Sequence, residues 1–253
     1  MPQEETQGDS SALYRDDPVL DSFSYAVLLT EEECGDVWRV LRSRKVEWRK
    51  RGCYYTFGTA LTLDYTPETD NYYGAIAGNN TGMLAAFSSL YPSVARALSQ
   101  TLGAPANCAS FAALPGFNIF GARDSSSPEA SHPPRYGVHF DGQHHYLPDE
   151  WSTRIEDVIS FTLPIVLPAA GGGLDVWPLS HADYLLSPEL DDLECWIAAR
   201  PSRFIPYRVG ELVVHRALLL HRIARWDISA TTAPRVTLQG HGILVDGVWH
   251  LYW

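Results

Sequence analysis

Three histidines and Asp141 lie within "RYGVHFDGQHHYLPDEW", residues 135–151. His139 and Asp141 are two residues apart, so on a β-strand both side chains point to the same face. An adjacent imidazole and carboxylate are two of the three protein ligands that non-haem Fe(II) sites use, with other positions left open. His144 and His145 follow the strand and are predicted to lie on the loop that leaves it. An H-x-D pair alone is common, so the metal interpretation needs a third ligand.

Two histidines further along the chain are candidates for that third ligand. His215 and His221 both lie in strand-like segments of "GELVVHRALLLHRIARW", residues 210–226. A short turn near Arg216–Ala217 would join the two strands. The residues by themselves leave both histidines open as ligands.

A third polar segment follows in "PRVTLQGHGI", residues 234–243. The two-residue period of a strand places four polar side chains on one face: Arg235, Thr237, Gln239 and His241. Val236 and Leu238 lie on the other face. An arginine with a hydroxyl two residues on can hold a carboxylate from the same side. The segment therefore predicts either a solvent-facing strand or a strand that lines the mouth of a barrel.

The elements that must position these residues are mostly short strands, with helices gathered near the N-terminus. Helices are predicted over 31–44, where Thr30 and Glu33 form a capping box, and over 81–102, broken near Pro92 and ended by Gly103. Strands are predicted at 24–30, 53–65, 109–120, 136–141, 157–167, 173–177, 203–208, 211–215, 217–223, 234–244 and 247–252. Segment 184–199 is helical or irregular, and 123–134 is a long loop. This order favours a sandwich or jelly roll with flanking helices.

The composition is that of a folded globular protein. The chain has 253 residues, 45% of them hydrophobic, which suits one domain of this size. We expect a flexible acidic tail over 1–20 and a single domain over 21–253. The four cysteines form no C-x-x-C pair, no apolar run is long enough to cross a bilayer, and no secretory signal is evident. These features predict a cytoplasmic protein. Its oligomeric state stays open between a monomer and a homodimer.

The ordered motif resembles that of the Fe(II)/2-oxoglutarate-dependent dioxygenases, which carry H-x-D, a distal histidine and then an arginine. In this chain the motif reads His139, Asp141, His221 and Arg235, with Thr237 in an R-x-S/T arrangement. "GGGLDVWPLSH" (171–181) and "GELVVHRALLLH" (210–221) are also similar to segments of that family. The resemblance covers roughly residues 109–245 and leaves the N-terminal helices unassigned.

This resemblance implies a fold, cofactors and roles for the motif residues. The fold is mainly β with flanking helices, a double-stranded β-helix or cupin-like jelly roll. His139, Asp141 and His221 would bind Fe(II) and form the catalytic centre, and the family register favours His221 over His215. Arg235 and Thr237 would bind the cosubstrate 2-oxoglutarate, with O2 as the oxidant. Because Asp141 is present, the family pattern implies hydroxylation, desaturation or ring closure rather than halogenation.

The substrate is predicted to be a small molecule, such as a free amino acid or a natural-product intermediate. A formal net charge of −11 disfavours nucleic acids and anionic membranes as partners. The candidate substrate contacts are Arg123, Arg135, Tyr136, His145 and Trp177. His181 is expected to be structural, and His241 to lie deeper in the barrel.

Two other classes of protein fit part of the pattern. A cupin-type metalloenzyme would use the same barrel and metal without 2-oxoglutarate, and Arg235 would then have no cosubstrate to hold. A catalytically silent barrel would bind a ligand without turnover. Both alternatives stay open at the level of the sequence.

Overall fold

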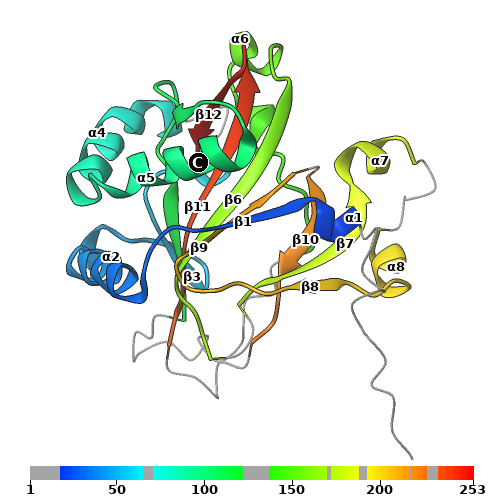
Figure 1. Ribbon diagram of the computed structural model, residues 1–253, viewed down its shortest axis with the longest axis horizontal. Coiled ribbons are helices and arrows are strands. Elements are labelled where there is room, and N and C mark those ends of the chain that lie inside the picture. The colour runs from blue at the N-terminus through cyan, green and yellow to red at the C-terminus, as the bar shows by residue number, and fades with distance from the viewer. Residues whose placement is uncertain are drawn as a thin grey trace, which may run out of the picture.

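The computed structural model describes residues 18–64, 71–121, 137–169, 172–187, 193–216, 218–226 and 233–253. Helices gather in its first half and strands in its second (Figure 1). Residues 1–17 of the expected tail lie outside the described residues. Residues 18–20 belong to the short helix α1 (Pro18–Asp21), where Val19 is buried in an apolar cluster. No helix among the described residues is long and apolar enough to span a membrane.

The N-terminal half folds largely into helices. Helix α2 (Glu31–Ser43) begins with the predicted capping box, in which the Glu33 amide donates to the Thr30 hydroxyl and the Thr30 amide donates to the Glu33 carboxylate. The second helical region is two helices, α4 (Asn71–Ala86) and α5 (Leu90–Leu102). Pro92 lies in the first turn of α5, where its missing N–H costs nothing. Gly103 ends that helix with a left-handed backbone, as predicted.

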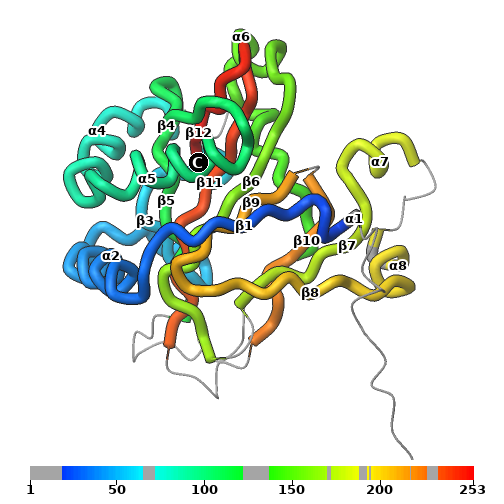
Figure 2. Tube along the Cα trace, in the orientation of Figure 1, coloured from blue at the N-terminus to red at the C-terminus, as the bar shows by residue number. Residues whose placement is uncertain are grey.

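The strands form two sheets that face each other (Figures 1 and 2). The larger sheet runs in the order β1-β9-β6-β11-β5-β3-β2, and β12 pairs with β11 and β4. Its strands are β1 (Phe23–Val27), β2 (Arg49–Arg51), β3 (Tyr54–Phe57), β4 (Ala106–Cys108), β5 (Gly116–Phe120), β6 (Asp157–Val166), β9 (Glu211–His215), β11 (Arg235–Val245) and β12 (Val248–Tyr252). The smaller sheet has the order β10-β7-β8, from β7 (Leu174–Ser180), β8 (Arg203–Ile205) and β10 (Leu219–Ile223). This arrangement, antiparallel except for the parallel β12–β4 pair, is a jelly roll.

Short helical segments connect the strands. They are the 3-10 helices η2 (Lys45–Glu47) and η4 (Gln143–Tyr146) and the α-helices α3 (Leu61–Asp64), α6 (Asp149–Ser152), α7 (His181–Leu185) and α8 (Leu193–Ala198). Helix α8 lies within the segment 184–199 that is predicted to be helical or irregular, and α7 ends at its first residues.

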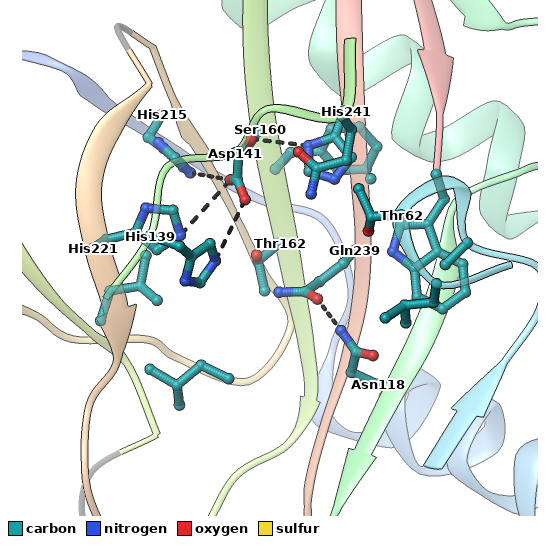
Figure 3. Close-up of a pocket in the computed structure, with 18 of the residues that line it drawn as sticks. Thr62, Asn118, His139, Asp141, Ser160, Thr162, His215, His221, Gln239 and His241 are labelled. Carbon is teal, nitrogen blue, oxygen red and sulfur yellow. Dashed lines mark hydrogen bonds and ion pairs between the residues drawn. The ribbon is translucent and has the colours of Figure 1, made fainter. Parts of the chain in front are cut away.

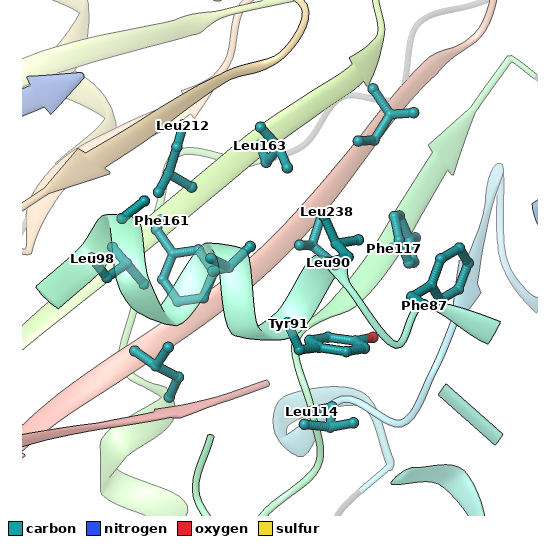
Figure 4. Packing of buried hydrophobic residues seen from close by; sticks show 14 of the residues in the cluster. Phe87, Leu90, Tyr91, Leu98, Leu114, Phe117, Phe161, Leu163, Leu212 and Leu238 are labelled. Atoms are coloured by element: carbon teal, nitrogen blue, oxygen red, sulfur yellow. The ribbon is translucent and has the colours of Figure 1, made fainter. Parts of the chain in front are cut away.

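The two faces of the larger sheet differ in chemistry. One face packs against α2 and α5, where Phe161, Leu163 and Leu238 of the strands meet Leu90 and Leu98 of α5 (Figure 4). The opposite face, toward the smaller sheet, carries buried polar side chains: Ser160, Thr162, His215, Arg235, Thr237 and His241. The alternation predicted for residues 234–243 is therefore present. The apolar face holds the helices, and the polar face is left for a site.

Several predicted strands are shorter in the structure. The strand predicted over 53–65 ends at Phe57, and residues 61–64 form helix α3, because the Asp64 carboxylate accepts from the Ala60 amide and pairs with Arg49 and Arg51. The strand predicted over 109–120 starts at Gly116. In the described part of 136–141, His139 forms an isolated bridge and no regular strand exists. Helix α4 starts ten residues earlier than predicted, because its first half has no apolar period to reveal it.

The Gly116 position on β5 should tolerate no side chain, because the Trp253 indole lies directly on its backbone. A Cβ atom there would lie 1.9 Å from two ring atoms of Trp253. We expect Gly116→Ala to lower the free energy of unfolding by about 1–3 kcal/mol, as forced overpacking does. Gly78→Ala is the control, since that helical glycine has nothing within 4 Å and alanine favours helix. Urea unfolding in which Gly116→Ala matches the wild type would contradict this packing.

Candidate metal centre

A backbone pair brings His139 and His221 together. The His139 amide donates to the His221 carbonyl at 2.9 Å, and the His221 amide donates to the His139 carbonyl at 3.0 Å. Directly opposed residues of an antiparallel pair project to the same face, and the two imidazole centroids are 4.6 Å apart. Asp141, two residues after His139, points the same way (Figure 3). Val138 and Phe140 pack on the other side, against the cluster of Trp177, Leu179 and Leu220.

The three side chains could share one metal ion. One ligand atom from each of His139, Asp141 and His221 lies within 4.8 Å of the others. The Nε2 atoms of His139 and His221 are each 3.7 Å from an oxygen of Asp141. His139 is the accessible member, with 45% of its side chain exposed. Among the described residues, these three side chains form the one group of histidine, cysteine and acidic residues that is spaced closely enough to hold a metal ion.

Backbone carbonyls fix the protonation of both imidazoles. The Nδ1 of His139 lies 2.9 Å from the Gly137 carbonyl oxygen, and that of His221 lies 2.8 Å from the Leu219 carbonyl oxygen. A carbonyl oxygen only accepts, so each Nδ1 carries the proton and donates it. Each Nε2 then keeps a free lone pair on the side of Asp141. Metal-binding histidines are oriented by this kind of Nδ1 hydrogen bond, so the residues present fit a divalent metal.

The electrostatics of the cluster also suit a metal. Burial alone would raise the pKa of the Asp141 carboxyl, but the attraction of His221, His215 and His241 outweighs it and holds that pKa well below its ordinary value. Burial lowers the pKa of His221 to about 4, more than the nearby Asp141 raises it. At neutral pH the aspartate is therefore ionised and His221 is neutral, which are the forms that bind metals.

A cavity of about 160 Å3 lies against this cluster. Its floor is made by β5, β6 and β11 of the larger sheet (Figure 3), and Thr62, Leu63 and Trp253 are among its other lining residues. The Asn118 amide on the floor donates to the Gln239 carbonyl oxygen. Among the described residues that line it, Asp141 is the one acid and none is lysine or arginine.

Arg235 and Thr237 lie together, behind the wall of this cavity. Both are 0% exposed, and neither lines the cavity. The Arg235 Nε donates to the Gly172 carbonyl at 2.8 Å, and its Nη1 donates to the Thr237 hydroxyl at 3.4 Å. The guanidinium carbon stands 5.6 Å from the ring centre of Phe120 and 5.8 Å from that of Tyr207, and both rings line the cavity. Arg235 is therefore one side chain removed from the open space.

Tyr207 is the polar residue of that separating layer. Burial raises the pKa of its phenol to about 12, against the opposing effects of Arg235 and of a hydrogen bond with Thr162. The phenol is thus neutral at physiological pH and can donate a hydrogen bond. A carboxylate in this part of the cavity would meet Tyr207 and Thr162 before it reached Arg235.

None of the predicted substrate contacts lines the cavity in the described part of the chain. Arg123, Arg135 and Tyr136, together with the loop 123–134, lie outside the described residues. His145 is an exposed residue of η4 that does not line the cavity, and its ring lies 3.9 Å from that of His144. Trp177 is 2% exposed, packs in a core cluster, and donates from its indole nitrogen to the Arg200 carbonyl. Its position gives no support to a substrate contact.

The other two histidines that were singled out have defined places. The His181 ring packs near Phe140 and His145, consistent with a structural role. His241 lines the cavity, and its Nδ1 lies 3.0 Å from the Ser160 hydroxyl oxygen. It is thus deep in the barrel, as predicted.

Several lining residues were not singled out from the sequence. Asn118 is the one polar residue of "GFNIF", and Thr162 alternates with apolar residues in β6, so the strand period could have indicated both. Thr62 and Tyr207 lie outside regular strands. No periodic signal marks them.

Comparison with known proteins places the fold. No family model matches the chain, and no curated protein matches its sequence. A structure of an N-substituted L-amino acid dioxygenase from Burkholderia ambifaria has a TM-score of 0.57 at 15% identity and covers 93% of this chain and 89% of that one. The same dioxygenase in complex with alpha-KG gives a TM-score of 0.55 at 14% identity, covering 93% and 88%.

A third solved structure is similar over a comparable length. The non-haem alpha-ketoglutarate-dependent epimerase SnoN from nogalamycin biosynthesis has a TM-score of 0.50 at 16% identity, covering 88% of this chain and 80% of that one. At such identities the likeness concerns the fold. The predicted jelly roll is thereby confirmed, and it is the fold of solved 2-oxoglutarate-dependent enzymes.

The burial of His241 makes the metal-free protein sensitive to acid. Its pKa is about 4 in the folded chain against an ordinary 6.5, so between these values the unfolded chain binds a proton that the folded chain does not. The free energy of unfolding should therefore fall as the pH falls from 6.5 toward 4. We expect His241→Asn, which keeps a polar group beside Ser160, to remove up to about 1.4 kcal/mol per pH unit of that slope. Urea unfolding between about pH 7 and pH 5 measures it, and equal slopes in variant and wild type would contradict it.

Proposed function

We propose that this protein is an Fe(II)/2-oxoglutarate-dependent oxygenase that hydroxylates, desaturates or cyclises a small molecule. The observation that carries the proposal is the cluster of His139, Asp141 and His221, with the two Nε2 lone pairs turned toward one carboxylate beside a cavity. The jelly roll around it is shared with solved dioxygenases that use 2-oxoglutarate. Both points favour this function over a silent barrel.

The chain's residues divide the work of such a reaction. His139, Asp141 and His221 would hold Fe(II), and the bound metal, with 2-oxoglutarate and O2, supplies the oxidising power for a substrate C–H bond. Arg235 and Thr237 would hold the far carboxylate of the cosubstrate, with the Tyr207 phenol between them and the open cavity. The buried floor of β6 and β11 keeps water from this end of the site.

The substrate would lie against the part of the cavity lined by Asn118, Gln239, Thr62 and Trp253. The hydrogen-bonded amides of Asn118 and Gln239 still have donors and acceptors to offer, which suits a small polar molecule. We propose a free or substituted amino acid or a natural-product intermediate, because one protein of similar fold is named an N-substituted L-amino acid dioxygenase and another comes from nogalamycin biosynthesis. Arg123 and Arg135 remain our proposed partners for a substrate carboxylate. A cytoplasmic location also stays a proposal.

Anaerobic addition of Fe(II) and 2-oxoglutarate tests the metal centre directly. We expect the weak visible charge-transfer band of the ternary complex in the wild type and its loss in His221→Ala, because one of three ligands is gone. His215→Ala, the matched control, should still form the band at saturating Fe(II), since its nitrogen lies outside the group of three ligand atoms. Loss of the band in His215→Ala with retention in His221→Ala would contradict the assignment of the third ligand.

Arg235 distinguishes a 2-oxoglutarate enzyme from a cupin that does not use this cosubstrate. We expect Arg235→Lys to raise the 2-oxoglutarate concentration needed for half-maximal uncoupled succinate formation by about 10- to 100-fold, the effect of losing a charge-assisted hydrogen bond. Arg222→Lys is the control, because Arg222 pairs with Asp175 and lines no part of the cavity. An Arg235→Lys variant that folds and has an unchanged cosubstrate dependence would favour the cupin alternative.

A further inference from the structure

The last residue of β9, His215, is a fourth imidazole beside the candidate metal ligands. It is 4% exposed, and its Nε2 lies 3.5 Å from an oxygen of Asp141 (Figure 3). It does not belong to the group of three whose ligand atoms are mutually within 4.8 Å. The proposed function gives His215 no role in binding the metal or the cosubstrate.

His215 is one member of a row that crosses the larger sheet. Phe23, His215, Ser160, His241 and Tyr252 stand directly opposite one another on β1, β9, β6, β11 and β12. Opposed residues share a face of the sheet, so the row runs under the site. His215, Ser160 and His241 of this row lie around Asp141 (Figure 3).

The orientation of the His215 ring is fixed by its neighbours. The ring stacks on Phe23, with centroids 5.4 Å apart and planes 21° apart, and meets His221 edge-on at 5.2 Å. These contacts direct Nε2 to the carboxylate of Asp141. Its Nδ1 is buried and has no hydrogen-bond partner among the described residues. Burying an unpaired nitrogen is costly, so packing alone is a poor explanation for a histidine here.

Proton placement singles out His215 among the imidazoles around Asp141. His139 and His221 donate from Nδ1 to backbone carbonyls, so in their neutral forms the nitrogens that face Asp141 carry no proton. His215 has no such acceptor at Nδ1, so its proton can reside on Nε2 and be donated to the carboxylate. Of the three imidazoles in contact with that carboxylate in the described chain, His215 is the one able to donate while the other two bind metal.

We propose that His215 is a positioning residue for the metal ligand Asp141. Its Nε2–H would donate to Oδ2, the carboxylate oxygen that His221 also faces, and would so keep Oδ1 toward His139. The need is evident from the backbone, because Asp141 follows an isolated bridge and no regular strand holds it in place. This inference rests on the metal centre proposed above. In this proposal, His215 at the end of β9 aligns Asp141, a metal ligand that lies on a loop.

Three substitutions separate this role from packing. His215→Gln carries its amide nitrogen about as far from the backbone as Nε2, whereas His215→Asn carries its amide at the position of Nδ1. His215→Phe keeps the stack on Phe23 and removes the donor. We expect Asn and Phe to weaken Fe(II) binding by about 10- to 100-fold, the usual effect of losing a hydrogen bond to a metal ligand. His215→Gln should stay within a few-fold of the wild type.

The measurement is the anaerobic dissociation constant of Fe(II) alone, from competition with a chelator, without 2-oxoglutarate or turnover. Thermal unfolding of each metal-free variant reports whether it folds. Equal affinities for the Gln and Asn variants would overturn the positioning role while leaving the metal centre intact. Complete loss of binding in all three variants, as in His221→Ala, would overturn it in favour of a fourth ligand. A wild-type chain that does not bind Fe(II) would overturn the proposed function together with this inference.

Discussion

The candidate site depends on one pair of reciprocal backbone hydrogen bonds, between His139 and His221. These residues are far apart in sequence, and no regular strand carries the first of them. The pair aligns two imidazoles on one face and brings Asp141 with them. The cluster is thus held by the pairing of the 137–142 segment with β10, while the larger sheet supplies the floor. A shift of the 137–142 segment by one residue against β10 would turn His139 and Asp141 to the other face, away from His221.

The larger sheet makes a site possible because its two faces are occupied so differently. On β11, Val236 and Leu238 face the helices, and Thr237 and Gln239 face the smaller sheet. Helices α2 and α5 cover the apolar face, so its burial stabilises the sheet whatever stands on the other side. The inner face is then free to carry buried polar groups, provided that each finds a partner. The Ser160–His241 and Arg235–Thr237 contacts are such partners.

The sequence was most informative where chemistry and strand period coincide. The H-x-D pair, the polar alternation of residues 235–241 and the capping box at Thr30 each encode their geometry within a few residues, and each is present in the structure. Sequence could not show that Arg235 stands behind Tyr207 or that His215 faces Asp141. Those contacts join elements through register between distant strands and through a loop residue. Trp177 illustrates the converse, because an aromatic in a motif-like segment packs in the core.

The charge distribution around the cavity suggests how the triad and Arg235 could act on one ligand. The described lining holds one carboxylate among neutral imidazoles, amides and hydroxyls, and its positive counterpart, Arg235, is set back within the sheet. A divalent metal at the triad would leave a net positive charge at one end of this space, and Arg235 places another toward the far end of β11. A dicarboxylate fits between two such charges, whereas a monoanion would satisfy only one of them. In the proposed site, Arg235 stands behind the neutral Tyr207 and would act only on a ligand that has already entered the cavity.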